Sequence, residues 1–440
     1  MFGVKKNRKM KKILIFNCSR LLVFLKKQCY NKSKINLIFY GEKHLIMYEY
    51  VRDFEKLGLG LFVHFGLYSV LGKGEWALNI NHIPKEKYKK LADRFNPSKN
   101  WAKNLAKTAK KAGAKYITLT TRHHDGYSLF NTKGLSTYDA VNTAPKRDLI
   151  REFVDACNEE EIIPFFYHTL MDWDREEYKT DFNKYLDYLI ASVELLCKNY
   201  GKVGGFWFDG MWDKKDADWQ EDRLYGVIRK YQPEAMIINN TGLSELGKLG
   251  HRELDSVTFE RGKPRMIDKK ARYVASEMCQ VLNDHWGYAK YDCNYKSVAE
   301  IINNFIDCRK CDCNFLINTG LKGNGEINTI DKGILLELGK WVKKNKYVYT
   351  CRSCQIQADN ADVLFDGEYY YAVIKNVAMK GDENVQLSSK TQAVKIYADI
   401  KDAKWYDCGK KVEIKDGVIK PLKYRYGESY CTRTVRFTVK

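Results

Sequence analysis

Several apolar, strand-like runs in the first half of the chain end in a histidine or an aspartate. The end residues are His64, the pair His123 and His124, His168, and Asp209. A single residue of this kind most often caps the following helix or bonds a loop amide. A set is more informative, because imidazole and carboxylate groups bind vicinal hydroxyl groups while indoles, here Trp76 and Trp207, cover the C–H patches of a ring. The combination favours a sugar as the ligand.

The elements that must position these side chains alternate along the chain. Helical periodicity predicts helices over 101–112, 148–160, 182–200 and 219–231. Runs of β-branched and aromatic residues predict strands over 116–121, 162–167, 205–209 and 235–238. Such alternation forms βαβ units and a parallel sheet. The spacing favours an α/β fold, a (β/α)8-like TIM barrel with catalytic residues at the carboxyl ends of its strands.

An open doubly wound sheet is the alternative fold for the same alternation. No glycine-rich phosphate fingerprint follows the first strands, which argues against a dinucleotide-binding version of it. Beyond residue 346 the pattern changes to short alternating segments separated by turn residues such as Asp366-Gly367 and Asp416-Gly417. This pattern is typical of a small antiparallel β-sandwich. We therefore expect a catalytic barrel over 47–346 and a β-sandwich over 347–440.

More than half of the net positive charge lies at the start of the chain. The formal net charge is +20, and residues 1–47 hold twelve Lys and Arg against the single acidic residue Glu42. That segment carries +11, which leaves +9 over the remaining 393 residues. Because the lysines of the body are interspersed with acidic residues, we expect no nucleic-acid partner.

Residues 1–46 also differ from the rest in pattern. The apolar run 13–25 follows Lys11-Lys12 as in a signal peptide, but Arg20 interrupts it and no small-residue cleavage site follows. The run is too short to span a membrane. We expect a basic, poorly ordered extension, no membrane partner and a cytoplasmic location, with secretion left open.

The 13 cysteines include a C-x2-C-x-C cluster and a C-x2-C pair. The cluster is Cys308, Cys311 and Cys313, and the pair is Cys351 and Cys354. Four thiolates in two pairs can hold zinc, whereas reduced cysteines also serve as small core residues. Because the spacing is irregular for the known zinc classes, we expect no metal and no cofactor.

A series of motifs in the barrel region resembles family 29 of the glycoside hydrolases, the α-L-fucosidases. Residues 59–69 resemble the opening barrel strand of that family, and Trp207-Phe208-Asp209-Gly210 resembles its nucleophile strand. Further matching motifs lie at 74–76, 95–97, 112–116, 123–127, 146–149, 276–278 with 286–288, and 314–318. They occur in order over about residues 50–346, and this order makes the resemblance specific.

The resemblance implies an exo-acting, retaining α-L-fucosidase that removes terminal α-L-fucose from fucosylated oligosaccharides or glycosides. Asp209 matches the nucleophile of the family. The positions that match contacts to the fucose are His64, Glu75, Trp76, His123, His124, Tyr167 and Trp207, with Arg252 as a further contact in looser surroundings. For the acid/base, the least uniform position of the family, we predict Glu260. The alternative is Glu277, which would otherwise be a structural carboxylate.

The implied mechanism needs two carboxyl groups about 5–5.5 Å apart, one ionised and one protonated. Two departures from the family pattern, Phe65 in place of a common Trp and Ala77 in place of a common Tyr, concern the rim of the pocket. The alternative functions are a catalytically inactive carbohydrate-binding protein and an exo-glycosidase that acts on a related sugar.

Overall fold

The computed structural model describes residues 35–40, 43–241, 250–267, 272–377 and 392–440. Within these residues eight parallel strands close into a barrel, in which the last strand pairs with the first. The strands are β3 (Leu59–His64), β4 (Tyr116–Arg122), β5 (Ile163–Thr169), β6 (Gly205–Asp209), β7 (Met236–Asn239), β8 (Ser256–Glu260), β9 (Ala275–Gln280) and β10 (Asn314–Gly320). The predicted α/β barrel is confirmed, and the open doubly wound alternative is wrong.

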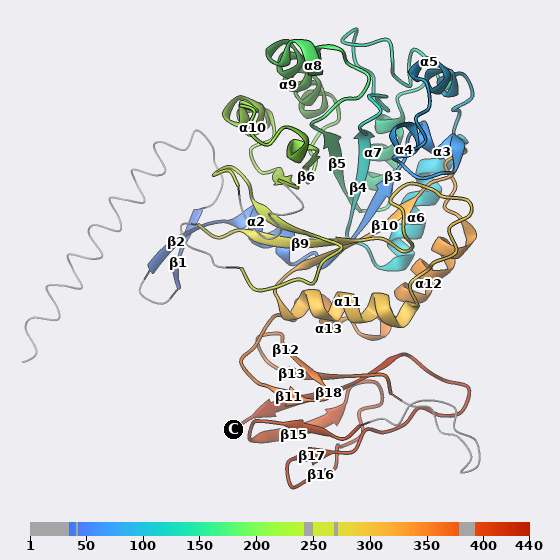
Figure 1. Ribbon diagram of the computed structural model, residues 1–440. Helices are drawn as coiled ribbons and strands as arrows, with labels where there is room; N and C mark the ends of the chain where they lie inside the picture. The colour runs from blue at the N-terminus through green and yellow to red at the C-terminus, as the bar shows by residue number, and fades with distance from the viewer. Residues whose placement is uncertain (1–34, 41–42, 242–249, 268–271, 378–391) are drawn as a thin grey trace, which may run out of the picture.

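Helices surround the barrel (Figure 1). The longer ones are α6 (Trp101–Ala112), α7 (Leu149–Glu159), α9 (Phe182–Asn199), α10 (Glu221–Tyr231), α11 (Val298–Lys310) and α12 (Thr329–Lys344). Shorter ones are α2 (Glu49–Glu55), α3 (Tyr68–Leu71), α4 (Ala77–Ile80), α5 (Lys85–Lys89), η1 (Lys90–Asp93), α8 (Glu177–Thr180), η2 (Met211–Lys214) and α13 (Tyr347–Thr350). The four helices and four strands predicted from periodicity agree with the structure within two residues at each end.

Local signals explain where the long helices begin and end. Asp148 accepts a hydrogen bond from the backbone N–H of Arg151 at the start of α7, and Asp181 caps α9 in the same way. Gly113 ends α6 with a φ of 90°, a left-handed conformation that favours glycine. The described residues between β7 and β8, and between β8 and β9, form no helix.

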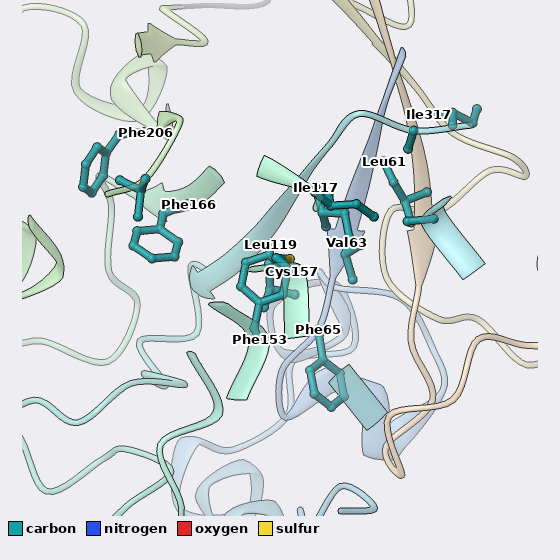
Figure 2. Close-up of a cluster of buried hydrophobic side chains, with 14 of the residues drawn as sticks. Leu61, Val63, Phe65, Ile117, Leu119, Phe153, Cys157, Phe166, Phe206 and Ile317 are labelled. Carbon is teal, nitrogen blue, oxygen red and sulfur yellow. The ribbon is translucent and has the colours of Figure 1, made fainter. Parts of the chain in front are cut away.

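Alternation along each strand divides the side chains between two faces. Figure 2 shows the outward set, which packs against the helices: Leu61, Val63, Ile117, Leu119, Phe166, Phe206 and Ile317, with Phe153 and Cys157 of α7. The inward set fills the barrel with a second apolar cluster that includes Phe62, Tyr167 and Trp207. His64 and Asp209 are two residues beyond Phe62 and Trp207 on the same strands, so they face the interior at its upper end.

The C-terminal region forms two antiparallel sheets of four strands each, below the barrel in Figure 1. One has the order β11 (Ala358–Asp359), β14 (Val394–Ile396), β17 (Val418–Ile419) and β16 (Ile414–Lys415). The other has the order β12 (Asp362–Phe365), β13 (Tyr370–Lys375), β18 (Thr432–Val439) and β15 (Ile400–Trp405). A shared core that includes Ile374, Val394 and Ile419 packs one sheet on the other, as expected for the predicted sandwich.

The sandwich is attached to the barrel through buried polar and aromatic contacts. The Trp341 indole of α12 donates to the Thr432 hydroxyl of β18 over 2.9 Å. Tyr347 stacks on Tyr371 with ring centroids 4.6 Å apart. The division into units at residue 347 stays a prediction, because the barrel core continues into β12 and β13.

The predicted extension over 1–46 lies largely outside the described residues. Within it the structure describes the backbone of β1 (Ile35–Tyr40) and the start of β2 (Lys43–Tyr48), which pair antiparallel. Among the described helices, none combines the length and the apolar character needed to cross a membrane.

Candidate active site

A cavity of about 410 Å³ lies where several barrel strands reach their carboxyl ends. It is lined by Phe62, His64, Glu75, Trp76, His123, His124, Tyr167, Trp207, Asp209, Trp212, Glu260, Arg261 and Trp286. The structure thus brings together all the predicted catalytic and sugar-binding residues except Arg252. A barrel places such residues at this end because the loops that follow the strands surround it.

Asp209, the last residue of β6, accepts hydrogen bonds from three neutral donors. The Tyr167 hydroxyl is 3.1 Å from Oδ2, while the Trp212 indole and the Asn240 amide are 3.2 and 3.3 Å from Oδ1. Burial raises the pKa of the Asp209 carboxyl, and the hydrogen bonds from these donors oppose the rise by favouring the charged form. The Tyr167, Trp212 and Asn240 donors are therefore the groups that favour the ionised form of Asp209 in its buried setting.

Glu260, the last residue of β8, is bridged to Asp209 by the Asn240 side chain. The amide nitrogen of Asn240 lies 2.6 Å from Oε2 of Glu260 and 3.3 Å from Oδ1 of Asp209. The two oxygens are therefore no more than about 6 Å apart, which is below the roughly 6.5–9.5 Å of inverting glycosidases. Burial, followed by repulsion from Asp209, raises the pKa of Glu260 to about 7.

His64 presents a hydrogen-bond acceptor to the cavity. Its Nδ1 is 2.7 Å from Oδ1 of Asn318, whose amide nitrogen donates to the Trp286 carbonyl over 2.8 Å. Since Oδ1 only accepts, Nδ1 of His64 carries the proton and Nε2 is left as an acceptor. Burial lowers the pKa of His64 to about 3, so the ring is neutral.

The His124 ring, just beyond the end of β4, also presents a hydrogen-bond acceptor to the cavity. Its Nδ1 lies 2.7 Å from the Thr169 hydroxyl, whose own proton is donated to the Met171 carbonyl over 2.8 Å. Nε2 of His124 is then an acceptor, 3.6 Å from Oδ2 of Asp209. Burial lowers the pKa of His124 to about 3. Burial, followed by repulsion from His124, also holds the pKa of His123 well below its usual value. A ligand hydroxyl can donate to these neutral imidazoles.

The loop after β3 brings one acid and one indole to the cavity. Glu75 accepts the backbone N–H of Gly287 over 2.7 Å, and burial raises the pKa of its carboxyl. Trp76 stacks on Trp212 with ring centroids 6.0 Å apart and meets Trp173 edge-on at 5.0 Å. The three indoles form an aromatic wall beside Asp209.

Glu277, the alternative acid/base, is bonded below the cavity and does not line it. Its carboxyl accepts the Trp207 indole N–H over 3.0 Å and the Tyr116 hydroxyl. The register explains the difference, because Glu277 of β9 pairs with Thr258 of β8, two residues before Glu260. Glu277 therefore lies one layer deeper in the barrel and holds Trp207 in place, while Glu260 reaches the cavity.

Comparison with known proteins identifies the family. The model of the family described as Alpha-L-fucosidase matches residues 42–347. The chain belongs to the alpha-L-fucosidase family. A putative alpha-L-fucosidase of Caenorhabditis elegans is 25% identical over 340 residues, which cover 68% of this chain and 69% of that protein.

Solved fucosidases have the same architecture. Alpha-L-fucosidase isoenzyme 1 from Paenibacillus thiaminolyticus superimposes with a TM-score of 0.77 at 28% identity, covering 89% of this chain and 99% of that one. A family 29 fucosidase from Bacteroides thetaiotaomicron, solved as a trapped covalent intermediate with 2-fluoro-fucosyl fluoride, gives 0.72 at 24% identity over 92% and 100% of the two chains. Because the Bacteroides thetaiotaomicron structure is only 24% identical, its similarity shows a shared fold and nothing further.

Arg252, which the sequence predicted as a further sugar contact in looser surroundings, is not among the residues that line the cavity. Its side chain is 76% exposed and forms an ion pair of 2.9 Å with Asp222 of α10. Its contact with the sugar stays a prediction.

Phe62, Trp212, Arg261 and Trp286 line the cavity without having been predicted, and Asn240 bonds both carboxyl groups. Asn240 directly follows β7, so the same strand-end argument used for Asp209 would have found it. Trp286 lies within one of the family motifs. Trp212 gave no separate signal, because it lies in the short helix η2, whose path depends on the tertiary structure. Arg261 directly follows β8, a strand that the periodicity did not predict.

Across the described ranges, no cluster of three or more His, Cys, Asp or Glu side chains has the arrangement of a metal site. Cys308 and Cys313 are fully buried and pack in the large hydrophobic core.

Proposed function

We propose that this chain is an exo-acting, retaining α-L-fucosidase, with Asp209 as nucleophile and Glu260 as acid/base. The observation that carries the proposal is the Asn240 bridge, which keeps the two carboxyl oxygens within about 6 Å of one another. That separation is closer to the roughly 5–5.5 Å of retaining glycosidases than to the roughly 6.5–9.5 Å of inverting ones. Direct attack by the carboxylate is the chemistry that fits.

The reaction proceeds in two displacements. An oxygen of Asp209 bonds to the anomeric carbon while the bond to the leaving oxygen breaks, and Glu260 gives its proton to that oxygen. Glu260, now a carboxylate, takes a proton from water, whose oxygen then displaces Asp209 from the anomeric carbon. The sugar leaves with its original anomeric configuration, and both carboxyl groups return to their starting states.

The environments of the two carboxyl groups suit these opposite roles. Asp209 accepts three hydrogen bonds from neutral donors, which favour its charge. Burial and then the repulsion of Asp209 favour the protonated form of Glu260, against its single hydrogen bond from Asn240. In such a pair the proton resides on Glu260 before the first step.

The lining of the cavity supports fucose as the sugar. The neutral rings of His64 and His124 present acceptors for its hydroxyl groups. Fucose also carries a methyl group where other hexoses have a hydroxymethyl group, and this methyl needs an apolar contact. Phe62 lies in the cavity with Trp207 and Trp286 at centroid distances of 5.0 and 5.8 Å.

A substrate panel tests the proposal. We expect an aryl α-L-fucoside to be the preferred substrate, with kcat/KM about 10²-fold above that for the matching α-L-galactoside, which adds only a hydroxyl group at C6. The aryl β-D-galactoside serves as the control for unrelated configuration. Binding of fucose without hydrolysis of any glycoside would favour the inactive sugar-binding protein, and preference for another sugar would refute the specificity.

The activity should fall on both sides of a pH optimum. Because the pKa of Glu260 is raised to about 7, the proton needed for the first step is lost as the pH rises through that value. kcat/KM should then decline tenfold for each further pH unit. On the acidic side, protonation of Asp209 removes the nucleophile. Glu260→Gln should abolish the alkaline limb, and an unchanged alkaline limb in this variant would refute the assignment.

A further inference from the structure

Three buried polar side chains lie behind the active site, where the ends of β4 and β5 meet helix α9. Arg122, the last residue of β4, pairs in register with His168 of β5, and Asp172 follows in the loop after β5. Each of the three is at most 1% exposed, and none lines the cavity of Asp209 and Glu260. Because a buried polar group without a partner costs free energy, the hydrogen bonds of these three side chains need an account.

The Arg122 guanidinium uses only part of its donor capacity. Its Nη1 donates to the hydroxyl groups of Tyr188 and Ser192 on α9 over 2.7 and 3.3 Å. Its Nε and Nη2, which share one edge of the group, are buried and have no hydrogen-bond partner in the described part of the chain. That edge is the fork with which arginine binds oxygen acceptors. Two buried donors are therefore directed at an acceptor that the protein does not supply.

His168 supplies one buried acceptor. Its Nδ1 lies 2.8 Å from the Thr121 hydroxyl, whose own proton is donated to the Tyr167 carbonyl over 2.8 Å. Nδ1 thus carries the ring proton, and Nε2 is an acceptor. This Nε2 is buried and finds no partner among the described residues. Burial, and then the positive charge of Arg122, hold the pKa of His168 well below its usual value, so the ring is neutral.

Asp172 supplies the other acceptor. Its Oδ1 accepts the backbone N–H groups of Asp174 and Arg175 over 2.8 and 3.0 Å. Its Oδ2 is buried and has no partner within the described ranges. Burial raises the pKa of the Asp172 carboxyl, and the charge of Arg122 is the largest effect that opposes the rise. The two side chains are therefore close enough to interact, although no hydrogen bond joins these two described residues.

The unpartnered atoms form the complement of a water molecule. They are two donors and two acceptors, and water accepts and donates two hydrogen bonds each. An anion would add a second negative charge beside Asp172, and a cation would meet the charge of Arg122, so a neutral ligand fits. We propose that Arg122, His168 and Asp172 hold an internal water molecule, and that Arg122 and Asp172 are through it positioning residues of the sugar site.

The water would join two segments that carry parts of that site. Arg122 lies two residues before His124, and Asp172 directly precedes Trp173. The N–H of Trp173 donates to the His124 carbonyl over 2.8 Å, and the ring centroids of these two residues are 5.4 Å apart. Trp173 also meets Trp76 edge-on. A bridge behind the cavity fixes the same two segments a second time, and so sets the position of His124 and of the aromatic wall. This positioning role rests on the proposed function, whereas the water site does not.

A high-resolution crystal structure of the wild-type protein tests the water site directly. We expect electron density for a water molecule within about 2.7–3.2 Å of the Arg122 fork, Nε2 of His168 and Oδ2 of Asp172. A site without density, or one that holds an ion, would overturn the proposal. This measurement does not depend on any activity of the protein.

Two conservative variants test the positioning role. Asp172→Asn keeps Oδ1 for the backbone N–H groups but puts a donor where Oδ2 accepts, and Arg122→Lys keeps the charge but removes the fork. We expect KM for 4-nitrophenyl α-L-fucoside to rise about 5-fold in each variant, because His124 and the aromatic wall lose their support. kcat should stay within about twofold, since Asp209 and Glu260 keep their contacts.

Arg309→Lys is the matched control. Arg309 is 0% exposed, and its Nε also has no partner in the described part of the chain. It donates to the carbonyls of Cys313 and Cys351, outside the cavity. This variant should lower Tm and leave KM unchanged.

Each other kinetic outcome overturns the positioning role. A rise in KM of the same size in Arg309→Lys would mean that a buried arginine supports only the fold. An unchanged KM in both Asp172→Asn and Arg122→Lys, or a loss confined to kcat, would show that the two residues do not position the sugar site. A wild type inactive on every fucoside would instead refute the proposed function, and the crystallographic test of the water would still stand.

Discussion

Replacing Asp209 by alanine should lower kcat on an aryl α-L-fucoside on the order of 10⁴-fold or more, the size of loss seen when a catalytic nucleophile is removed. The expected loss is large because Asp209 is the group that forms the bond to the anomeric carbon. Steady-state kinetics measures the loss, and calorimetry with fucose checks that the sugar still binds.

The chemistry of the Asp209→Ala variant can be rescued. The substitution leaves a space beside the donors of Tyr167, Trp212 and Asn240, and azide is a small anion that fits it. Azide should then displace the leaving group directly and yield fucosyl azide of inverted configuration. Asp213→Ala is the matched control, because Asp213 bonds Tyr178 away from the cavity and its loss should leave kcat nearly unchanged. A near-normal rate in Asp209→Ala would remove Asp209 from the mechanism.

Replacing Glu260 by alanine should reduce activity by about 10²- to 10⁴-fold on substrates with poor leaving groups, the usual contribution of a general acid/base. The loss should be much smaller for formation of the intermediate from a dinitrophenyl fucoside, because that leaving group needs no proton. Azide should accelerate breakdown of the intermediate and yield fucosyl azide of retained configuration. This product distinguishes Glu260 from Asp209, whose rescue gives the inverted azide.

Glu277→Ala is the comparison that decides between the two glutamates. The Trp207 indole and the Tyr116 hydroxyl would lose their buried acceptor, which should cost about 1–3 kcal/mol of the free energy of unfolding. Activity should fall on all fucosides alike as Trp207 shifts, without dependence on the leaving group and without rescue by azide. Rescue of Glu277→Ala with a retained product, and its absence in Glu260→Ala, would reverse the assignment.

The positions of the strands and the set of residues at their ends could be predicted from the sequence. Hydrophobic alternation is a local property, and parallel strands place their carboxyl ends at one edge whatever the details of the loops. His64, His123, His124 and Asp209 were identified in this way. His168 shows the limit of the argument, since it faces the outer layer and bonds Thr121 over 2.8 Å.

Residues in the loops could not be placed by the same reasoning. Arg252 and Arg261 both come from the segment around β8, yet the first pairs with α10 and the second lines the cavity. Trp212 reaches Asp209 only because η2 turns back after Gly210, which has a φ of 98°. Such paths depend on contacts with distant parts of the chain, and no local pattern encodes them.

By itself, then, the sequence predicted the barrel, the polar residues at its strand ends and a candidate nucleophile, because each of these follows from the period of a strand or from an ordered set of family motifs. Only the tertiary structure showed that Glu260 lines the cavity and Glu277 does not. Both are inward glutamates on neighbouring strands, and the register of β8 against β9 sets one a layer below the other. The Asn240 side chain then bridges Glu260 and Asp209 by hydrogen bonds. Glu277 instead accepts a hydrogen bond from the Trp207 indole.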